Sequence, residues 1–136
     1  MIHLTKDMTT GIAKVDEQHQ ELVKMLNGLL SMGTQAIAKE EMKKAIDFLG
    51  DYVMKHFNEE ESLQRQSSYK KYEMHKEQHK EFINTFKVLK EDFAVNGPSA
   101  KFVVSLNSSV ISWIVKHIKG ADVEFGKYYQ EQNQPK

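Results

Sequence analysis

Apolar residues recur every three or four positions in four separate stretches of this chain. The stretches start at Leu22, near Lys39, at Tyr72 and at Val103. This spacing puts the apolar side chains of each stretch along one face of an α-helix. No stretch alternates with the two-residue period of a β-strand. The pattern therefore predicts an all-α protein with four helices of roughly 20 residues, each about 30 Å long.

Polar residues and breaks in the pattern predict where the first two helices begin and end. Residues 1–15 show no sustained period and are predicted to form an irregular N-terminal arm. Asp16 is a candidate N-cap for the first helix, which is expected to end between Gly33 and Ala38. The second helix is expected to run from about residues 39–41 to Ser67.

Glycine and proline mark the later boundaries. In the segment 96–99, glycine suits a helix end and Pro98 suits the first turn of the next helix. Gly120 is predicted to end the fourth helix, followed by an amphipathic piece at 123–129 and a polar tail at 131–136. Short connections make neighbouring helices antiparallel, so we expect one domain, residues 1–136, folded as an up-down-up-down four-helix bundle.

Histidines occupy core positions in all four apolar stripes: His19, His56, His75, His79 and His117. For a single such histidine, an imidazole that is buried in the core and hydrogen-bonded to a neighbour is the simpler interpretation. Five cases in four stripes favour a shared buried metal site, because neutral imidazole is a common metal ligand.

The positions of these histidines along the helices agree with a shared site. His19 lies near the start of the first helix, and His56 lies near the end of the second. His75 and His79 lie near the start of the third helix, and His117 lies near the end of the fourth. In an antiparallel bundle all five fall at the same end.

Glu60 is the first carboxylate that fits this site, since it lies four residues after His56 on the same stripe. Its neighbours Glu59 and Glu61 are expected to point away, each by about 100° around the helix. A buried carboxylate is costly alone but not when it bridges two cations.

Asp122 is the second carboxylate, five residues after His117. On a regular helix this spacing places the two about 140° apart. We expect Gly120 to break the helix and allow Asp122 to turn back inward.

The seven candidate ligands, five nitrogen and two oxygen donors, are too many for one tetrahedral zinc ion. They suit two octahedral-type ions bridged by the carboxylates. Mixed histidine and carboxylate sites favour iron, with manganese and zinc as open alternatives.

Given these candidate ligands and their spacing, the sequence resembles the hemerythrin family in its single-domain bacterial form. The resemblance covers nearly the whole chain. The resemblance rests on four motifs: Asp16-Glu17-Gln18-His19, His56-Phe57-Asn58-Glu59-Glu60, His75 to His79, and Trp113 to Ile118 with Asp122. One departure is Phe125, where a tyrosine is common three residues after the bridging aspartate. This change removes a hydroxyl near the ligands.

The resemblance implies a role for each candidate residue. One iron would be held by His75, His79 and His117, and the other by His19 and His56. Glu60, Asp122 and a solvent-derived oxo or hydroxo group would bridge the pair. The second iron would keep an open position for dioxygen. Five residues fall on family pocket positions, although simple core packing explains them equally well: Leu22, Phe57, Trp113, Ile114 and Ile118.

Composition narrows the possible functions. The chain has 19 basic and 19 acidic residues and no cysteine, so neither nucleic acid nor an anionic membrane is expected as a partner, and thiolate metal sites are excluded. No signal peptide or membrane span is evident, so a cytoplasmic location is the expectation.

The resemblance implies reversible dioxygen binding for storage, delivery or sensing, by a monomer that is not an enzyme and that serves an unidentified oxygen-accepting protein. Two alternatives stay open. One is a di-iron enzyme that reduces peroxide or nitric oxide, and the other is an iron storage or iron-sensing protein.

Overall fold

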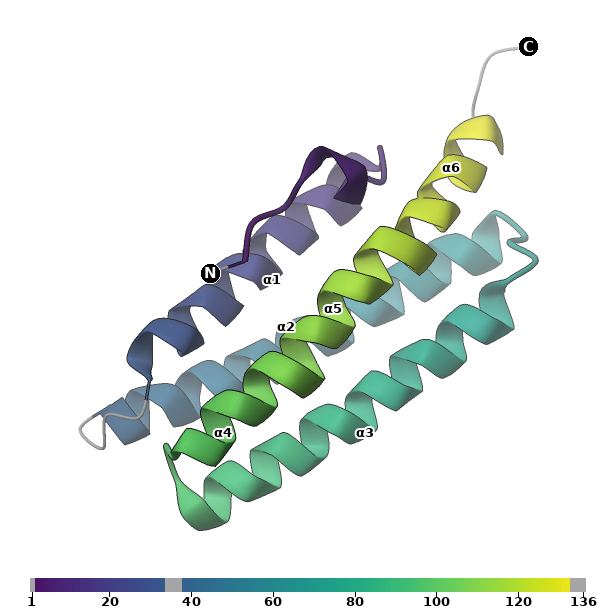
Figure 1. Cartoon of the computed structure of the whole chain (residues 1–136). Helices are drawn as coiled ribbons and strands as arrows, with labels where there is room; N and C mark the ends of the chain where they lie inside the picture. The colour runs from purple at the N-terminus through teal and green to yellow at the C-terminus, as the bar shows by residue number, and fades with distance from the viewer. Residues whose placement is uncertain (1, 34–37, 133–136) are drawn as a thin grey trace.

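The computed structural model describes residues 2–33 and 38–132, and they form the predicted four-helix bundle (Figure 1). Three helices are continuous: α1 (Ala13–Met32), α2 (Lys39–Gln66) and α3 (Tyr72–Asn96). The fourth helix of the bundle, called the fourth rod, consists of five consecutive helical segments: α4 (Ala100–Ser105), η3 (Leu106–Ile111), α5 (Ser112–His117), η4 (Ile118–Asp122) and α6 (Val123–Gln132). A short 3₁₀ helix, η1 (Lys6–Met8), precedes α1.

Neighbouring helices run antiparallel, as the short connections predict. The end of α1, the start of α2 and the α3–α4 connection lie at one end of the bundle, and the α2–α3 loop lies at the other (Figure 1). The start of α1, the end of α2 and the start of α3 therefore share one end with η4 and α6. This arrangement brings the predicted site residues to one level of the bundle.

The N-terminal arm is shorter than the sequence predicts, and the predicted cap is wrong. α1 begins at Ala13 with Ile12 as its N-cap. Asp16 lies inside the first turn of α1, where its carboxylate accepts hydrogen bonds from Thr10 N at 2.8 Å, Thr10 Oγ1 at 2.8 Å and Gly11 N at 3.1 Å. Asp16 therefore fastens the arm to α1 instead of capping the helix.

The same arm is held from the other side by α6. The side-chain amide of Gln130 donates to Thr10 O at 2.6 Å. A Cβ atom at Gly126 would lie 2.3 Å from Thr10 O, so glycine is required for this close approach. The arm is thus clamped between α1 and α6 at the end of the bundle that holds the histidines.

Most other helix ends lie close to their predicted positions. α1 ends at Met32, and Gly33 follows with a φ of 59°; the rest of the predicted range, 34–37, lies outside the described residues. α2 begins and ends as predicted. Pro98 is not in the first turn of the next helix. It precedes the N-cap Ser99, whose hydroxyl accepts a hydrogen bond from Phe102 N at 3.0 Å.

The prediction that Gly120 ends the fourth helix is wrong. The rod continues to Gln132 and twice takes a π-helical turn, at η3 and at η4. In η4 the N–H of Val123 bonds to the carbonyl of Ile118, five residues earlier. Helical structure reaches the first residues of the predicted polar tail, and residues 133–136 lie outside the described part.

Two apolar clusters enclose the level at which the histidines lie. The main core includes Leu26, Leu49, Phe82 and Phe102 and fills most of the bundle. A smaller cluster lies further toward the α2–α3 loop and comprises Ile12, Val15, Tyr69 and Phe125. Among the described helices, none combines the length and the hydropathy needed to span a bilayer.

Candidate metal centre

All seven residues predicted as metal ligands lie together in the structure and are buried. They form a five-residue cluster (Glu60, His75, His79, His117 and Asp122) and a four-residue cluster (His19, His56, Glu60 and Asp122). Within each cluster the potential ligand atoms lie within 4.8 Å of one another. The two carboxylates belong to both clusters, which is the arrangement that two bridged ions require.

Every helix of the bundle contributes to the centre through its apolar stripe. α1 supplies His19, α2 supplies His56 and Glu60, and α3 supplies His75 and His79. The fourth rod supplies His117 from α5 and Asp122 from η4. Residues three or four apart lie on one helix face, so the stripe itself directs the first six side chains inward.

Asp122 reaches the centre through the π-helical turn and not through a helix break. Hydrogen bonds between residues five apart widen the turn, so a side chain five residues after His117 returns to the same face. Asp122 Oδ1 lies 3.1 Å from His117 Nε2. Single π-helical turns within a longer helix are frequent at functional sites.

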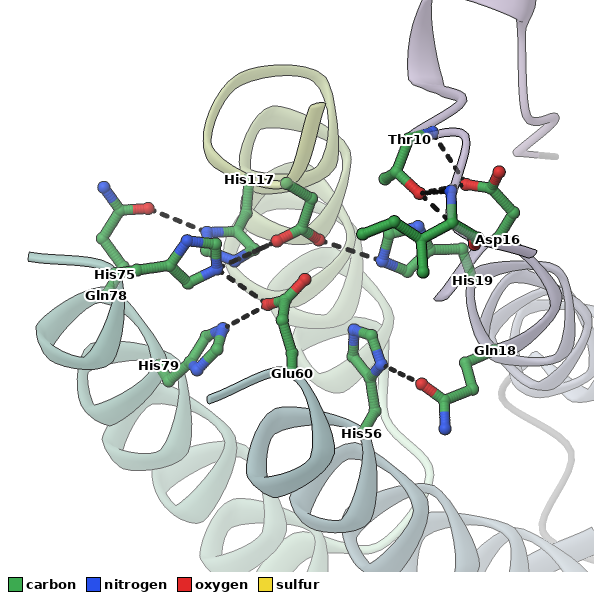
Figure 2. Close-up of polar contacts among 12 residues, drawn as sticks. Thr10, Asp16, Gln18, His19, His56, Glu60, His75, Gln78, His79 and His117 are labelled. Carbon is green, nitrogen blue, oxygen red and sulfur yellow. Dashed lines mark hydrogen bonds and ion pairs between the residues drawn. The ribbon is translucent and has the colours of Figure 1, made fainter. Parts of the chain in front are cut away.

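The histidines present their Nε2 atoms to the two carboxylates (Figure 2). His75 Nε2 lies 2.8 Å from Glu60 Oε1 and 3.0 Å from Asp122 Oδ1. His79 Nε2 lies 3.1 Å from Glu60 Oε1. On the other side, His19 Nε2 lies 2.9 Å from Asp122 Oδ2. Nitrogen and oxygen donors therefore converge on both sides of the carboxylate pair.

Several of these donor atoms are buried and form no hydrogen bond with any described residue, despite their short separations. They are His19 Nε2, His79 Nε2, His117 Nε2, Glu60 Oε2 and both carboxylate oxygens of Asp122. Buried polar atoms are normally paired. A set of unpaired nitrogen and oxygen donors around common points is what cations with mixed histidine and carboxylate coordination need, so the residues fit a two-metal centre.

The pKa values of the candidate ligands also indicate that the centre needs positive charge to balance its carboxylates. Burial would raise the pKa of Asp122, but His117, His19 and His75 hold it well below its usual range. Burial would lower the pKa of His75, but Asp122 and Glu60 raise it to about 10. Without a metal, protons therefore balance the buried carboxylates. A bound cation would replace those protons.

His56 differs from His75. Burial lowers the pKa of His56 to about 4, so its ring is neutral near pH 7 and can act as a ligand without first losing a proton.

An outer layer of side chains orients three of the histidines. Gln18 Oε1 lies 2.6 Å from His56 Nδ1, Glu61 Oε2 lies 2.8 Å from His79 Nδ1, and Gln78 Oε1 lies 2.8 Å from His117 Nδ1. Each acceptor selects the tautomer in which Nδ1 carries the proton and Nε2 presents a lone pair to the centre.

These partners were not predicted from the sequence. Glu59 and Glu61 belong to neither cluster, in line with their expected positions off the stripe, but both contact the outer layer of the centre. Glu61 contacts His79 directly, and Glu59 accepts a hydrogen bond from the amide of Gln18. Gln18 and Gln78 each lie one residue before a histidine of the site and within the motifs of the family resemblance, but they were given no role there.

A small cavity borders the four-residue cluster. Its volume is about 10 Å³, roughly the room that one water-sized molecule needs. The five predicted pocket residues, Leu22, Phe57, Trp113, Ile114 and Ile118, all line it together with Val53. His19, His56, His117 and Asp122 complete the lining. The cavity thus touches three members of the four-residue cluster, His19, His56 and Asp122, but only His117 and Asp122 of the five-residue cluster.

The structure is a four-helix bundle with two buried clusters of histidines that share two carboxylates. These features indicate an all-α protein with a candidate two-metal centre. A model of the hemerythrin HHE cation binding domain matches residues 10–128, and the chain belongs to the hemerythrin family. The predicted fold and the family resemblance are both confirmed.

Individual relatives support this assignment. The chain is 30% identical over 127 residues to a bacteriohemerythrin of Pseudomonas paraeruginosa, covering 92% of this chain and 80% of the relative. It is 28% identical over 112 residues to a myohemerythrin of Theromyzon tessulatum, covering 82% and 80%. A crystal structure of wild-type hemerythrin matches with a TM-score of 0.82 at 25% identity, covering 95% of this chain and 97% of that chain.

Proposed function

We propose that this chain holds two iron ions and binds dioxygen reversibly. His75, His79 and His117 would bind one ion, His19 and His56 would bind the other, and Glu60 and Asp122 would bridge them. The iron pair would supply two electrons to dioxygen and recover them on release. A monomeric state, a cytoplasmic location and an oxygen-accepting partner protein belong to the same proposal.

The position of the cavity is the observation that carries this function. The four-residue cluster offers one donor fewer than the five-residue cluster, and a metal site that reacts keeps a position open. The cavity lies against that smaller cluster and has room for about one small molecule. Its remaining walls are apolar, which favours a small uncharged ligand such as dioxygen.

The cavity walls also keep water and protons away from the ligand. Leu22, Phe57, Ile114 and Ile118 are each at most 4% exposed. Phe57 stacks on His79 with ring centroids 3.8 Å apart, and Trp113 stacks on His117 at 4.4 Å. A dry, apolar pocket limits proton delivery, and thereby favours release of dioxygen over its irreversible reduction.

The same cavity weighs against an enzyme that reduces peroxide or nitric oxide. Among the described residues that line it, the titratable ones are the four candidate ligands themselves. A general acid that is free to deliver a proton is therefore missing from this set, whereas reductive chemistry needs one within hydrogen-bond reach.

An air–argon cycle tests the proposed function. The anaerobically reduced protein, loaded with iron, should gain a visible absorption band in air and lose it again under argon over repeated cycles. Prompt oxidation in air without a reversible band would contradict reversible binding. As a matched test of the ligand set, His117→Ala should lower the iron content below two per chain, whereas Glu77→Gln, at an exposed position, should leave it at two.

A further inference from the structure

The two clusters differ in the charge of the side chains behind their histidines. In the five-residue cluster, the carboxylate of Glu61 contacts the ring of His79 directly, at 2.8 Å between Oε2 and Nδ1. In the four-residue cluster, the partner of His56 Nδ1 is the neutral amide oxygen of Gln18. His19 Nδ1 is buried and finds no hydrogen-bond partner among the described residues. Among the described residues, a carboxylate therefore contacts the outer nitrogen of a histidine in the five-residue cluster but not in the four-residue cluster.

The surroundings of Glu61 make its charge effective. Its side chain is 12% exposed, against 30% for Glu59, the carboxylate that contacts Gln18 behind the other cluster. Glu59 acts on His56 only through the amide of Gln18. Since solvent screens exposed charges more than buried ones, the contribution of Glu61 at its histidine exceeds that of Glu59.

A carboxylate that accepts the Nδ1 proton of an imidazole raises the basicity of the other ring nitrogen. His79 Nε2 faces Glu60 in the centre, so extra electron density on the ring is delivered on the metal-facing side. Greater donation stabilises the higher oxidation state of a bound ion.

We propose that Glu61 is a positioning residue that acts through His79 and makes the ion of the five-residue cluster the more readily oxidised of the two. The ion of the five-residue cluster, which has the smaller share of the cavity lining, would then be the better electron donor. The ion of the four-residue cluster would keep the weaker donor set, because His56 is backed by a neutral amide and His19 Nδ1 has no hydrogen-bond partner among the described residues. This inference rests on the proposed iron pair and adds an electronic difference between its two halves.

Three substitutions test the assignment through the reduction potential of the iron-loaded protein. Glu61→Gln keeps a hydrogen-bond acceptor and removes the charge. It should raise the midpoint potential by about 59 mV, which corresponds to a tenfold change in the ratio of oxidised to reduced protein for one electron. Gln78→Glu places a carboxylate behind His117 and should shift the potential in the opposite direction.

Glu77→Gln is the matched control. It removes the same charge from α3 at a side chain that is 70% exposed and pairs with Lys80. The control should leave the potential unchanged. Equal shifts for Glu61→Gln and Glu77→Gln, or shifts of the same sign for Glu61→Gln and Gln78→Glu, would overturn the proposal.

A measurement on the metal-free protein separates this inference from the proposed function. In nuclear magnetic resonance spectra, the His79 Nδ1 proton should exchange slowly and resonate downfield, and it should move in Glu61→Gln but not in Glu77→Gln. If the His79 Nδ1 proton exchanged rapidly and its chemical shift were unchanged in Glu61→Gln, the role of Glu61 would be overturned, whatever the iron content. Failure of the wild-type chain to bind iron would instead contradict the proposed function.

Discussion

The two ends of the bundle fill equivalent helix faces with different chemistry. Toward the α3–α4 connection, the inward faces carry fully buried apolar side chains such as Leu26, Leu49 and Phe102. Toward the α2–α3 loop, the same stripes carry histidines and carboxylates. We call these the apolar end and the metal end. The apolar end is stabilised by its own packing, whereas the candidate ligands at the metal end include buried carboxylates that need protons or cations.

This difference predicts that the two ends respond to different perturbations. Substitutions at the apolar end should change the free energy of unfolding without changing the metal content. Substitutions at the metal end should change the metal content first, because each donor there would serve a bound ion.

The largest effect is expected from Glu60→Ala. Glu60 belongs to both clusters, so its removal takes a donor from both ions at once. The metal content should fall from two ions to below one per chain, as measured by elemental analysis of the iron-loaded protein. Retention of two ions would show that Glu60 does not bridge them.

Leu49→Ala is the corresponding test at the apolar end. Leu49 is fully buried in the main core, so truncation leaves a cavity and should cost about 2–5 kcal/mol of unfolding free energy. Denaturant titration measures the loss, and elemental analysis should still find two ions per chain. A matching loss of metal would contradict the separation between the two ends.

Acid should destabilise the metal-free protein through its metal end. The pKa of His56 is lowered from 6.5 to about 4 in the folded chain, so the unfolded state binds more protons between these values. Stability from the neutral ring is present above pH 6.5 and is lost as pH falls toward 4, by up to about 3 kcal/mol. Denaturant titrations between pH 4 and 6.5 should show this slope, the fall of the unfolding free energy with falling pH.

Two variants show where that slope originates. His56→Gln should reduce it, because glutamine does not titrate. Leu49→Ala should lower stability at every pH and leave the slope intact. If the slope were the same in His56→Gln as in the wild-type chain, another group would be its source.

The smallest effect is expected from Gly126→Ala, which disturbs the clamp on the N-terminal arm. The new methyl group would lie 2.3 Å from Thr10 O, so the arm must shift, at a cost of about 1–3 kcal/mol. Because the arm lies at the metal end, a chelator should remove iron faster from this variant although every ligand is intact. Gly28→Ala, at a position with open space around it, serves as the control.

Most of the centre could be predicted from the sequence because its residues follow the periodicity of regular helices. His19, His56, Glu60, His75, His79 and His117 all lie on apolar stripes, and the antiparallel order of the helices places them at one level. This reasoning needs only the geometry of a regular helix. It located six of the seven residues of the two clusters by their spacing.

The remaining features depend on geometry that periodicity does not contain. Asp122 faces inward because of a π-helical turn, which five-residue spacing on a regular helix does not predict. Glu61 lies off the face of its own helix, yet the ring of His79 on α3 extends to meet it. Asp16 bonds to an irregular arm whose path has no period. Partners on neighbouring segments, and not the helix itself, determine these roles.

The most direct test of a two-metal end is an anaerobic titration of the metal-free protein with ferrous iron. We predict saturation at two ions per chain, because the seven donors form two clusters that share Glu60 and Asp122. Saturation at one ion per chain, or the lack of any saturable binding, would contradict the account.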